Sequence, residues 1–186
     1  INVYACFDNE EVGSGTKQGA ASTFLYDVLW RINNALGKDE EEFRRAVAGS
    51  FMLSCDNAHA LHPNYRQKSD ETNCVYMNEG VVIKSHAGQK YTSDAVSVAI
   101  FKMICENAEV PVQFFSNRSD EAGGSTLGNI AMTQVSMNTV DVGLPQLAMH
   151  SAYETAGVKD TEYMVKAVTE FYTSNIRRDS DGNYRM

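Results

Sequence analysis

The sequence lacks long hydrophobic runs, is poor in proline and has fewer basic than acidic residues. No apolar run approaches the roughly 20 residues that a membrane-spanning helix requires, which argues against such a helix. Only three residues are proline and no tract is of low complexity, so no linker between domains is visible. Lys and Arg number 16 against 24 Asp and Glu, a net charge of −8, and nucleic acid is therefore excluded as a partner.

The chain also lacks paired cysteines. Its four cysteines, Cys6, Cys55, Cys74 and Cys105, form no CxxC pair, and most of them stand in apolar surroundings. Free cysteine is commonly a small buried hydrophobic residue, and these spacings fit neither a metal motif nor a redox motif. The cysteines therefore predict free thiols and a reducing, cytoplasmic location.

What the sequence does contain is enough apolar material for one folded domain. Hydrophobic residues make up 43% and aromatic residues 10% of the 186 residues, too much for a disordered chain. The first residues, Ile1 to Phe7, predict a buried strand flush with the terminus, although most domains begin with loosely held residues. We therefore expect a piece of a longer protein, and a piece would not show a signal peptide.

Strand-like and helical hydrophobic patterns alternate along the rest of the chain. Gly37 is placed to end one helix and Ser93 to cap another, whose apolar side is expected to carry Val96, Ile100, Met103 and Ile104. The alternation predicts an α/β fold with a largely parallel sheet flanked by helices. We expect strands at residues 1–7, 51–55, 81–83, 112–115 and 139–142, helices at 24–36, 40–48, 93–104, 125–135 and 160–176, and a fraying polar tail at 177–186 with a turn at 179–182.

Metal-binding residue types follow several of the predicted strands. In open α/β sheets ligands bind beyond the carboxyl ends of the strands, where this sequence has Glu10 and Glu11, then Asp56 and His59, then His150. Each feature has a simpler explanation: an acidic surface turn, a local cap or a lone polar histidine. Because three strand ends carry carboxylates and imidazoles, the ligands that Zn²⁺ prefers, the convergence favours a metal site.

Adjacent Glu10 and Glu11 also suit a division of roles. Neighbouring side chains in an extended or turning segment point in different directions. One carboxylate is then free to bind a metal while the other accepts a proton from a water whose pKa the metal lowers. On this interpretation Glu10 is the general base and Glu11 the ligand.

Five stretches resemble, in order, the motifs of the M18 family of metallo-aminopeptidases, the aspartyl aminopeptidase group. They are FDNEEVGSG, SCDNAHALHPNY, KSHAGQKYTSDA, GGSTLG and TVDVGLPQLAMHSAYE. The resemblance implies a zinc-exopeptidase fold of the phosphorylase/hydrolase-like type, hydrolysis at a free peptide N-terminus and two divalent ions, Zn²⁺ or else Co²⁺ or Mn²⁺. It implies Glu10 as catalytic base, Glu11, Asp56 and His150 as metal ligands, and His59, Lys84, Tyr91, Gly124 and Ser125 as substrate-binding residues. His62 and His86 are expected to be structural.

The resemblance also implies that part of the site lies outside this chain. The family's site uses a bridging Asp and a His upstream of the Glu-Glu pair, and an inserted dimerisation domain also lies there. Residues 1–176 are therefore expected to be the C-terminal portion of a catalytic domain from a homo-oligomer, inactive when isolated.

Two alternatives stay open. One is a non-catalytic metal-binding or assembly module that a missing segment completes. The other is a metal-free hydrolase with Glu10 and Asp56 as paired carboxylates, which leaves His150 without a role. The metal identity and the preference for acidic, basic or apolar N-terminal residues also stay open.

Overall fold

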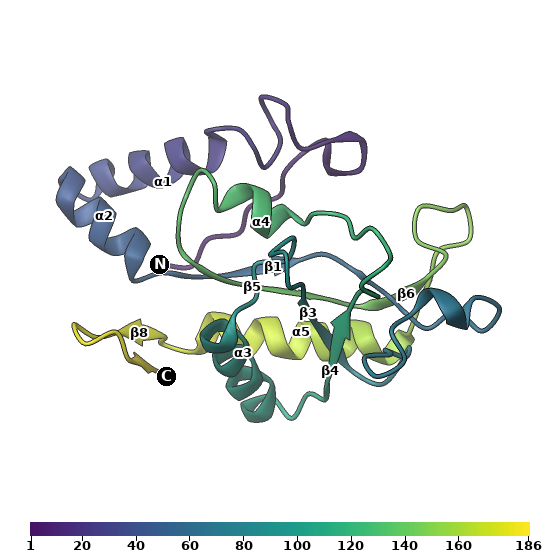
Figure 1. Cartoon of the computed structure of the whole chain (residues 1–186). Coiled ribbons are helices and arrows are strands. Elements are labelled where there is room, and N and C mark those ends of the chain that lie inside the picture. Colours follow the sequence, from purple (N-terminus) through teal and green to yellow (C-terminus); the bar gives the residue numbers. More distant parts are fainter.

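The protein folds into three layers, as seen in a computed structural model that describes residues 1–186 (Figure 1). A central four-stranded sheet has helices on both faces, so the predicted α/β class is confirmed. The sheet consists of β1 (Phe51–Cys55), β3 (Val81–Ser85), β4 (Val112–Ser116) and β5 (Asn138–Gly143). One face carries α3 (Ala95–Asn107) and α5 (Val158–Thr173), and the other carries α4 (Leu127–Ala131), with α1 (Phe24–Ala35) and α2 (Glu40–Ala48) beyond it.

The sheet is mixed, and its order is β1-β5-β3-β4. β1 pairs with β5 in parallel and β3 pairs with β4 in parallel. The two pairs meet in an antiparallel contact between β3 and β5, which joins Val82 to Gly143 and Ile83 to Val142. The carboxyl ends of β1 and β5 therefore share one edge of the sheet, while β3 and β4 run in the opposite direction.

A second, small sheet extends the β1–β5 pair toward this edge. It consists of β2 (Ala58–His59), β6 (Pro145–Leu147) and β7 (Thr155–Ala156), in the order β2-β6-β7. The ladder continues without a gap, since Asp56 N donates to Val142 O and Ala58 N to Leu144 O, both at 2.9 Å. A Cβ on Gly143 would lie 1.9 Å from the Asp56 carbonyl oxygen, so only glycine fits there. Asp56 thus lies within a continuous ladder, not in a loop beyond it.

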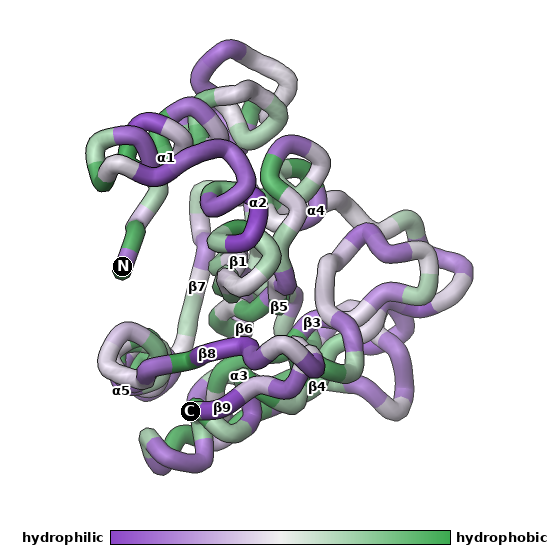
Figure 2. The backbone as a smooth tube through the Cα atoms, turned by 90° about the vertical axis from the view of Figure 1, so that its left-hand side faces the viewer, coloured by the Kyte–Doolittle hydropathy of each residue, from purple (hydrophilic) through white to green (hydrophobic).

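The main core lies between the sheet and the α3–α5 face. α3 buries Ser97, Ile100, Phe101, Ile104 and Cys105, the i, i+3, i+4, i+7, i+8 spacing of one helical face. These side chains pack with Val81, Ile83, Val140 and Val142 of the sheet and Ala167 of α5. The tube coloured by hydropathy is accordingly green along β1 and β3 at the centre of the molecule (Figure 2).

Two details of the α3 prediction are wrong. Asp94, not Ser93, caps the helix, because its carboxylate accepts from Ser97 N in a capping box. Ser93 instead donates its hydroxyl toward the backbone of β5. Val96 and Met103 are 48% and 51% exposed, so the buried face is rotated away from them.

The other helices follow the prediction with shifted ends. α1 ends at Ala35, and Gly37 follows in the left-handed region with φ 72°. α2 spans the predicted residues and begins with an Asp39 capping box. α5 starts and ends earlier than expected.

The predicted helix at 125–135 reduces to the short α4. Thr126 before it is extended because its hydroxyl is bonded to Asp141 in the sheet. After it, the Thr133 and Ser136 hydroxyls donate to Ile130 O and Met132 O, which favours turns over a continued helix.

The predicted strand at residues 1–7 is wrong. The segment forms no ladder, and Ile1 and Tyr4 are 91% and 81% exposed. It is held instead through α5, since Asn2 Nδ2 donates to Tyr172 O and the Tyr172 hydroxyl to Val3 O. A strand exists only where a neighbour accepts its backbone hydrogen bonds, and apolar composition alone does not supply one.

The tail does not fray as predicted. β8 (Arg177–Arg178) and β9 (Tyr184–Arg185) form a small hairpin, and the Tyr184 ring lies 6.4 Å from that of Phe51. The expected turn is confirmed, because the Asp179 carboxylate accepts from Asp181 N and Asn183 N. No helix of the protein has the length and apolarity to cross a bilayer.

All four cysteines are free, as predicted. Cys105 alone is buried, whereas Cys6 and Cys55 are exposed. The interpretation as buried hydrophobic residues therefore holds for Cys105 only.

Candidate active site

Glu10 and Glu11 lie in a tight turn. Residues Glu10–Val12 form a single 3₁₀ turn, entered through Asn9 at φ 66° and left through Gly13 at φ 126°. The side chain of Glu11 is 72% exposed, while Glu10 is partly buried. The predicted strand end is thus a turn, but the two carboxylates do differ in environment, as a division of roles requires.

Glu11 meets His150 across the molecule. Glu11 Oε2 lies 3.0 Å from His150 Nε2. His150 stands on the turn between β6 and β7 with φ 65°, and Ala148 has φ 55°. Left-handed backbone is uncommon outside glycine and concentrates at functional sites. Glu154 Oε1 accepts from His150 N at 2.6 Å and so supports this backbone conformation.

Asp56 and Lys84 form the second pair. Lys84 is only 2% exposed, and its Nζ lies 3.3 Å from both Asp56 Oδ2 and Asn57 O. The same ammonium lies 5.0 Å from the centre of the Tyr91 ring. A buried cation needs such partners to offset its lost hydration, so Lys84 is held beside Asp56 and is not a solvated surface residue.

Charged groups on these separate segments shift one another's pKa values. Burial raises the pKa of Glu10, and the negative charges of Asp56 and Glu11 raise it further, against the opposing effect of His150 and Lys84. Burial lowers the pKa of His59, and His150 and Lys84 act in the same direction against the opposing charge of Asp56. Groups from separate segments thus act on one another as one site.

The donor types fit a divalent cation. Glu11 and His150 supply a carboxylate oxygen and an imidazole nitrogen at one place. A cation there would also offset the negative charge that gathers around Glu10. Asp56, however, is paired with Lys84, and no three His, Cys, Asp or Glu side chains stand close enough together to hold an ion.

The predicted substrate residues Tyr91, Gly124 and Ser125 lie on two loops that touch each other. Tyr91 is 6% exposed, its hydroxyl accepts from Asn117 Nδ2, and burial raises its pKa. Lys90 Nζ donates to Gly123 O at 2.7 Å, which joins the two loops. Gly124 and Ser125 follow that contact and are exposed.

The other two histidines have local roles. His62 Nδ1 accepts from Asn64 N and His86 Nδ1 accepts from Gly88 N. The His86 ring also stands edge-on to that of Tyr91 at 5.7 Å. These contacts fit the expectation that His62 orders its loop, and they give His86, expected only to be structural, a similar local contact.

Sequence reasoning missed several residues around the site. Asn57 Nδ2 donates to Gln146 Oε1 and its Oδ1 accepts from Leu144 N, which locks the two strands beside Asp56. Asn117 and Glu154 were also missed. Glu154 lies four residues after His150, and that spacing within one turn was the available signal.

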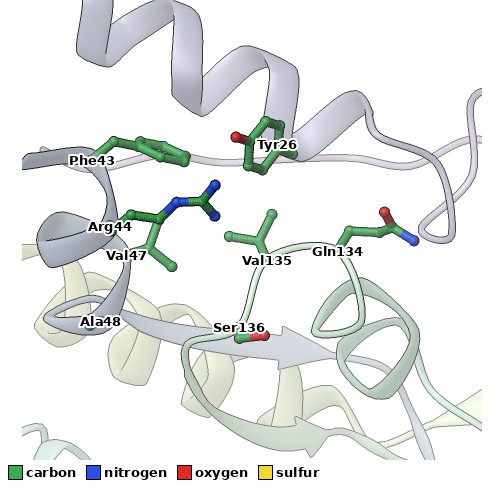
Figure 3. Close-up of a pocket in the computed structure, with 8 residues that line it drawn as sticks. All are labelled: Tyr26, Phe43, Arg44, Val47, Ala48, Gln134, Val135 and Ser136. Carbon is green, nitrogen blue, oxygen red and sulfur yellow. The ribbon is translucent and has the colours of Figure 1, made fainter. Parts of the chain in front are cut away.

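A separate pocket of about 200 Å³ lies between α1, α2 and the turn before β5 (Figure 3). It is lined by Tyr26, Phe43, Arg44, Val47, Ala48, Gln134, Val135 and Ser136. None of these is a carboxylate or an imidazole, so the pocket is not part of the candidate active site.

Comparison with known proteins identifies relatives for nearly the whole chain. The family model described as "Aminopeptidase I zinc metalloprotease (M18)" matches residues 1–172. A Clostridium acetobutylicum protein named "Probable M18 family aminopeptidase 2" is 54% identical over 171 residues, which are 92% of this chain and 40% of that protein. "Aspartyl aminopeptidase 1" of Schizosaccharomyces pombe is 42% identical over 92% of this chain and 36% of its own length.

Solved structures agree. A chain in the cryo-EM structure of the Ape4 and Nbr1 complex has a TM-score of 0.86 at 43% identity over 89% of this chain and 31% of that chain. Aminopeptidase 1 of yeast, solved as a dodecamer, has a TM-score of 0.78 at 28% identity over 89% of this chain and 36% of that chain. The chain therefore spans well under half the length of these relatives.

Proposed function

Because the chain belongs to the M18 family of zinc metalloproteases, we propose that the complete protein is a metal-dependent aminopeptidase that hydrolyses the first peptide bond of its substrates. The observation that carries the proposal is the 3.0 Å contact between Glu11 and His150, next to a partly buried Glu10 whose pKa is raised. A metal ligand pair beside a carboxylate poised to take a proton is what hydrolysis with a general base requires.

Glu11, Asp56 and His150 would hold the metal in this proposal, together with ligands from the part of the protein outside this chain. Two divalent ions, Zn²⁺ or else Co²⁺ or Mn²⁺, would polarise the scissile carbonyl and make a water acidic at neutral pH. Glu10 takes the proton from the attacking water and passes it to the leaving amine nitrogen. A partly buried carboxylate adjacent in sequence to a proposed ligand suits both halves of this transfer.

The neighbouring residues would bind substrate. Lys84 brings a buried positive charge next to Asp56, suited to a substrate carboxylate or a developing oxyanion. The imidazole of His59 would form a hydrogen bond with the substrate, and Tyr91 has its aromatic ring beside Lys84. Gly124 and Ser125 would contact the peptide on its carboxyl side.

The proposal also covers the substrates, assembly and location of the complete protein. Peptides are the expected substrates, and homo-oligomers are expected because a related structure is a dodecamer. The 186-residue chain alone is expected to be inactive, and the cytoplasmic location stays a prediction from the free cysteines.

One observation favours a second candidate for the isolated chain. Since no three potential ligands stand together, the chain by itself suits a non-catalytic module that other segments complete. This candidate predicts that the complete protein hydrolyses no peptide, whether or not it binds metal.

The test uses the complete protein, with metal analysis and release of N-terminal Asp or Glu from short peptides. Glu10→Gln should lower kcat by about 10²- to 10⁴-fold, the usual contribution of a general base, with bound metal unchanged. Glu162→Gln, an exposed substitution on α5, is the matched control and should leave kcat unchanged.

The outcomes separate the hypotheses. Stoichiometric metal with activity supports the aminopeptidase, and absence of activity supports the module. Activity that survives chelation points to the metal-free mechanism with paired carboxylates. A fully active Glu10→Gln variant overturns the assignment of Glu10 as base.

A further inference from the structure

Asp141 is a charged residue in the middle of the central strand. It lies in β5, is 0% exposed, and pairs in register with Ser54 of β1. Its neighbours Val140 and Val142 point into the α3–α5 core. Because side chains alternate along a strand, Asp141 faces the opposite side, toward α4 and the loops of the site.

One carboxylate oxygen of Asp141 receives three hydrogen bonds. Oδ2 accepts from Thr92 N at 2.5 Å, from Thr92 Oγ1 at 3.0 Å and from Thr126 Oγ1 at 2.9 Å. Thr92 directly follows Tyr91, and Thr126 directly follows Ser125. The two loops that carry the expected substrate contacts therefore share a single buried attachment point.

The surrounding packing leaves little freedom at this point. Gly128 N donates to Ser54 Oγ at 2.9 Å, next to Asp141 in register. A Cβ on Gly128 would lie 2.6 Å from Ser54 Cβ and 3.2 Å from Asp141 Oδ1. Ser93 Oγ also accepts from Asp141 N at 3.0 Å. The backbone at Ser93 and Gly128, close in sequence to Thr92 and Thr126, is thus also held against the sheet beside Asp141.

Stability alone does not account for a carboxylate here. Burying a charge is costly even with good partners, and Asp141 Oδ1 has no hydrogen-bond partner at all. A buried acceptor without a partner destabilises the folded state. An apolar residue would satisfy the core, but it would release Thr92 and Thr126.

We propose that Asp141 is a positioning residue for substrate binding, which holds the Tyr91 loop and the Ser125 loop in fixed relation to each other. It acts through Thr92 and Thr126 and does not touch the reacting atoms. The inference rests on the proposed aminopeptidase function for its kinetic consequence, but its structural consequence stands without it.

The kinetic test compares Asp141→Ala with Val140→Ala in the complete protein. Both residues are 0% exposed and adjacent in β5, so both substitutions destabilise the sheet, but only one frees the loops. Asp141→Ala should raise KM at least about tenfold, since small misplacements of binding groups are costly. Its kcat should fall by a smaller factor and its bound metal should not change. Val140→Ala should lower Tm and leave KM unchanged.

Thr126→Val serves where Asp141→Ala does not fold. It removes one hydroxyl with little change of shape, and it should raise KM by a smaller factor than loss of the carboxylate. Asp141→Asn keeps an oxygen that can accept these hydrogen bonds, so its KM should rise less than that of Asp141→Ala. An unchanged KM in an active Thr126→Val enzyme, or loss of metal from Asp141→Ala, overturns the proposal.

Amide hydrogen exchange provides the readout that does not depend on activity. Asp141→Ala should speed exchange in both loops, at residues 86–92 and 122–126, and Thr126→Val in its place should speed it at residues 122–126, whereas Val140→Ala should do neither. If the wild-type enzyme hydrolyses no peptide, the proposed function fails, and exchange alone then decides the role of Asp141. Unchanged exchange in both loops overturns it.

Discussion

The α3–α5 face of the sheet and the edge where Glu11 meets His150 differ in residue type and in exposure to solvent. Ten buried apolar or sulfur-containing side chains form a continuous core on the face. At the edge, the side chains of Glu11 and His150 are 72% and 69% exposed, and a carboxylate contacts an imidazole there. The difference teaches that stability and chemistry reside in separate regions joined by the same strands. Substitutions in the core should therefore act on stability and those at the edge on metal binding, whereas Asp141, which joins the sheet to two site loops, should affect both stability and KM.

The largest expected effect is in the core. Phe101 is 0% exposed in α3, and Phe101→Ala should lower the free energy of unfolding by about 3–5 kcal/mol. Met103→Ala on the same helix is the control, because Met103 is 51% exposed and its loss should cost little. Urea unfolding measures both. Equal losses of unfolding free energy in the two variants would contradict the separation of stability from chemistry. A changed KM in a folded Phe101→Ala variant would contradict it as well.

The next effect concerns the edge. His150→Ala or Glu11→Gln in the complete protein should weaken metal binding by at least about 100-fold, more than the loss of an indirect partner usually does. The Tm of the metal-free protein should stay the same, since both side chains are exposed. Tyr153→Ala, at an 85% exposed position of the same turn, should change neither quantity. Isothermal titration calorimetry with the metal measures the affinity of each variant. Wild-type affinity in both variants would reject Glu11 and His150 as metal ligands.

A smaller effect tests a charge on the stability side. Asp160 in α5 is 0% exposed and accepts from Asn78 N and Gly80 N at 2.6 and 3.0 Å. Asp160→Ala leaves these donors without a partner and should cost about 2 kcal/mol. Asp160→Asn keeps one acceptor and should cost less. Chemical denaturation measures the two, and a loss of metal binding in folded Asp160→Ala would contradict the division.

The smallest effect is at a helix cap far from both regions. Asp39 accepts from Glu42 N at 2.8 Å at the start of α2, and Asp39→Ala should cost about 1 kcal/mol. Asp39→Asn retains a good cap and should come close to wild type. Thermal unfolding separates them, and equal Tm values for all three proteins would show that the cap contributes nothing.

Elements with strong local patterns were predictable from the sequence. The α/β class, the strands expected at 51–55, 81–83, 112–115 and 139–142, and α1 and α2 follow from hydrophobic spacing and capping residues. The segment at 1–7 failed because a strand depends on a neighbour, which local composition does not reveal. The small sheet and the tail hairpin were missed since their strands are too short to show alternation.

The site divides in the same way. Residue types identified Glu11 and His150, and the structure brings these two together. That Asp56 is paired with a buried Lys84 follows from how the side chains fold together and has no trace in spacing. Asp141 escaped notice because an acidic residue between two valines gives no sign of which loops it will hold.

The ladder that carries Asp56 also constrains the order in which the protein folds. Gly143 can approach the Asp56 carbonyl only once β1 and β5, far apart in the sequence, have paired. The contacts of Glu11 with His150 and of Ser54 with Gly128 are equally non-local. Non-local contacts form slowly because long loops must close first. We therefore expect the edge that carries Glu11, Asp56 and His150 to form after the helices, so that a partly folded chain has its helices before its candidate site is complete.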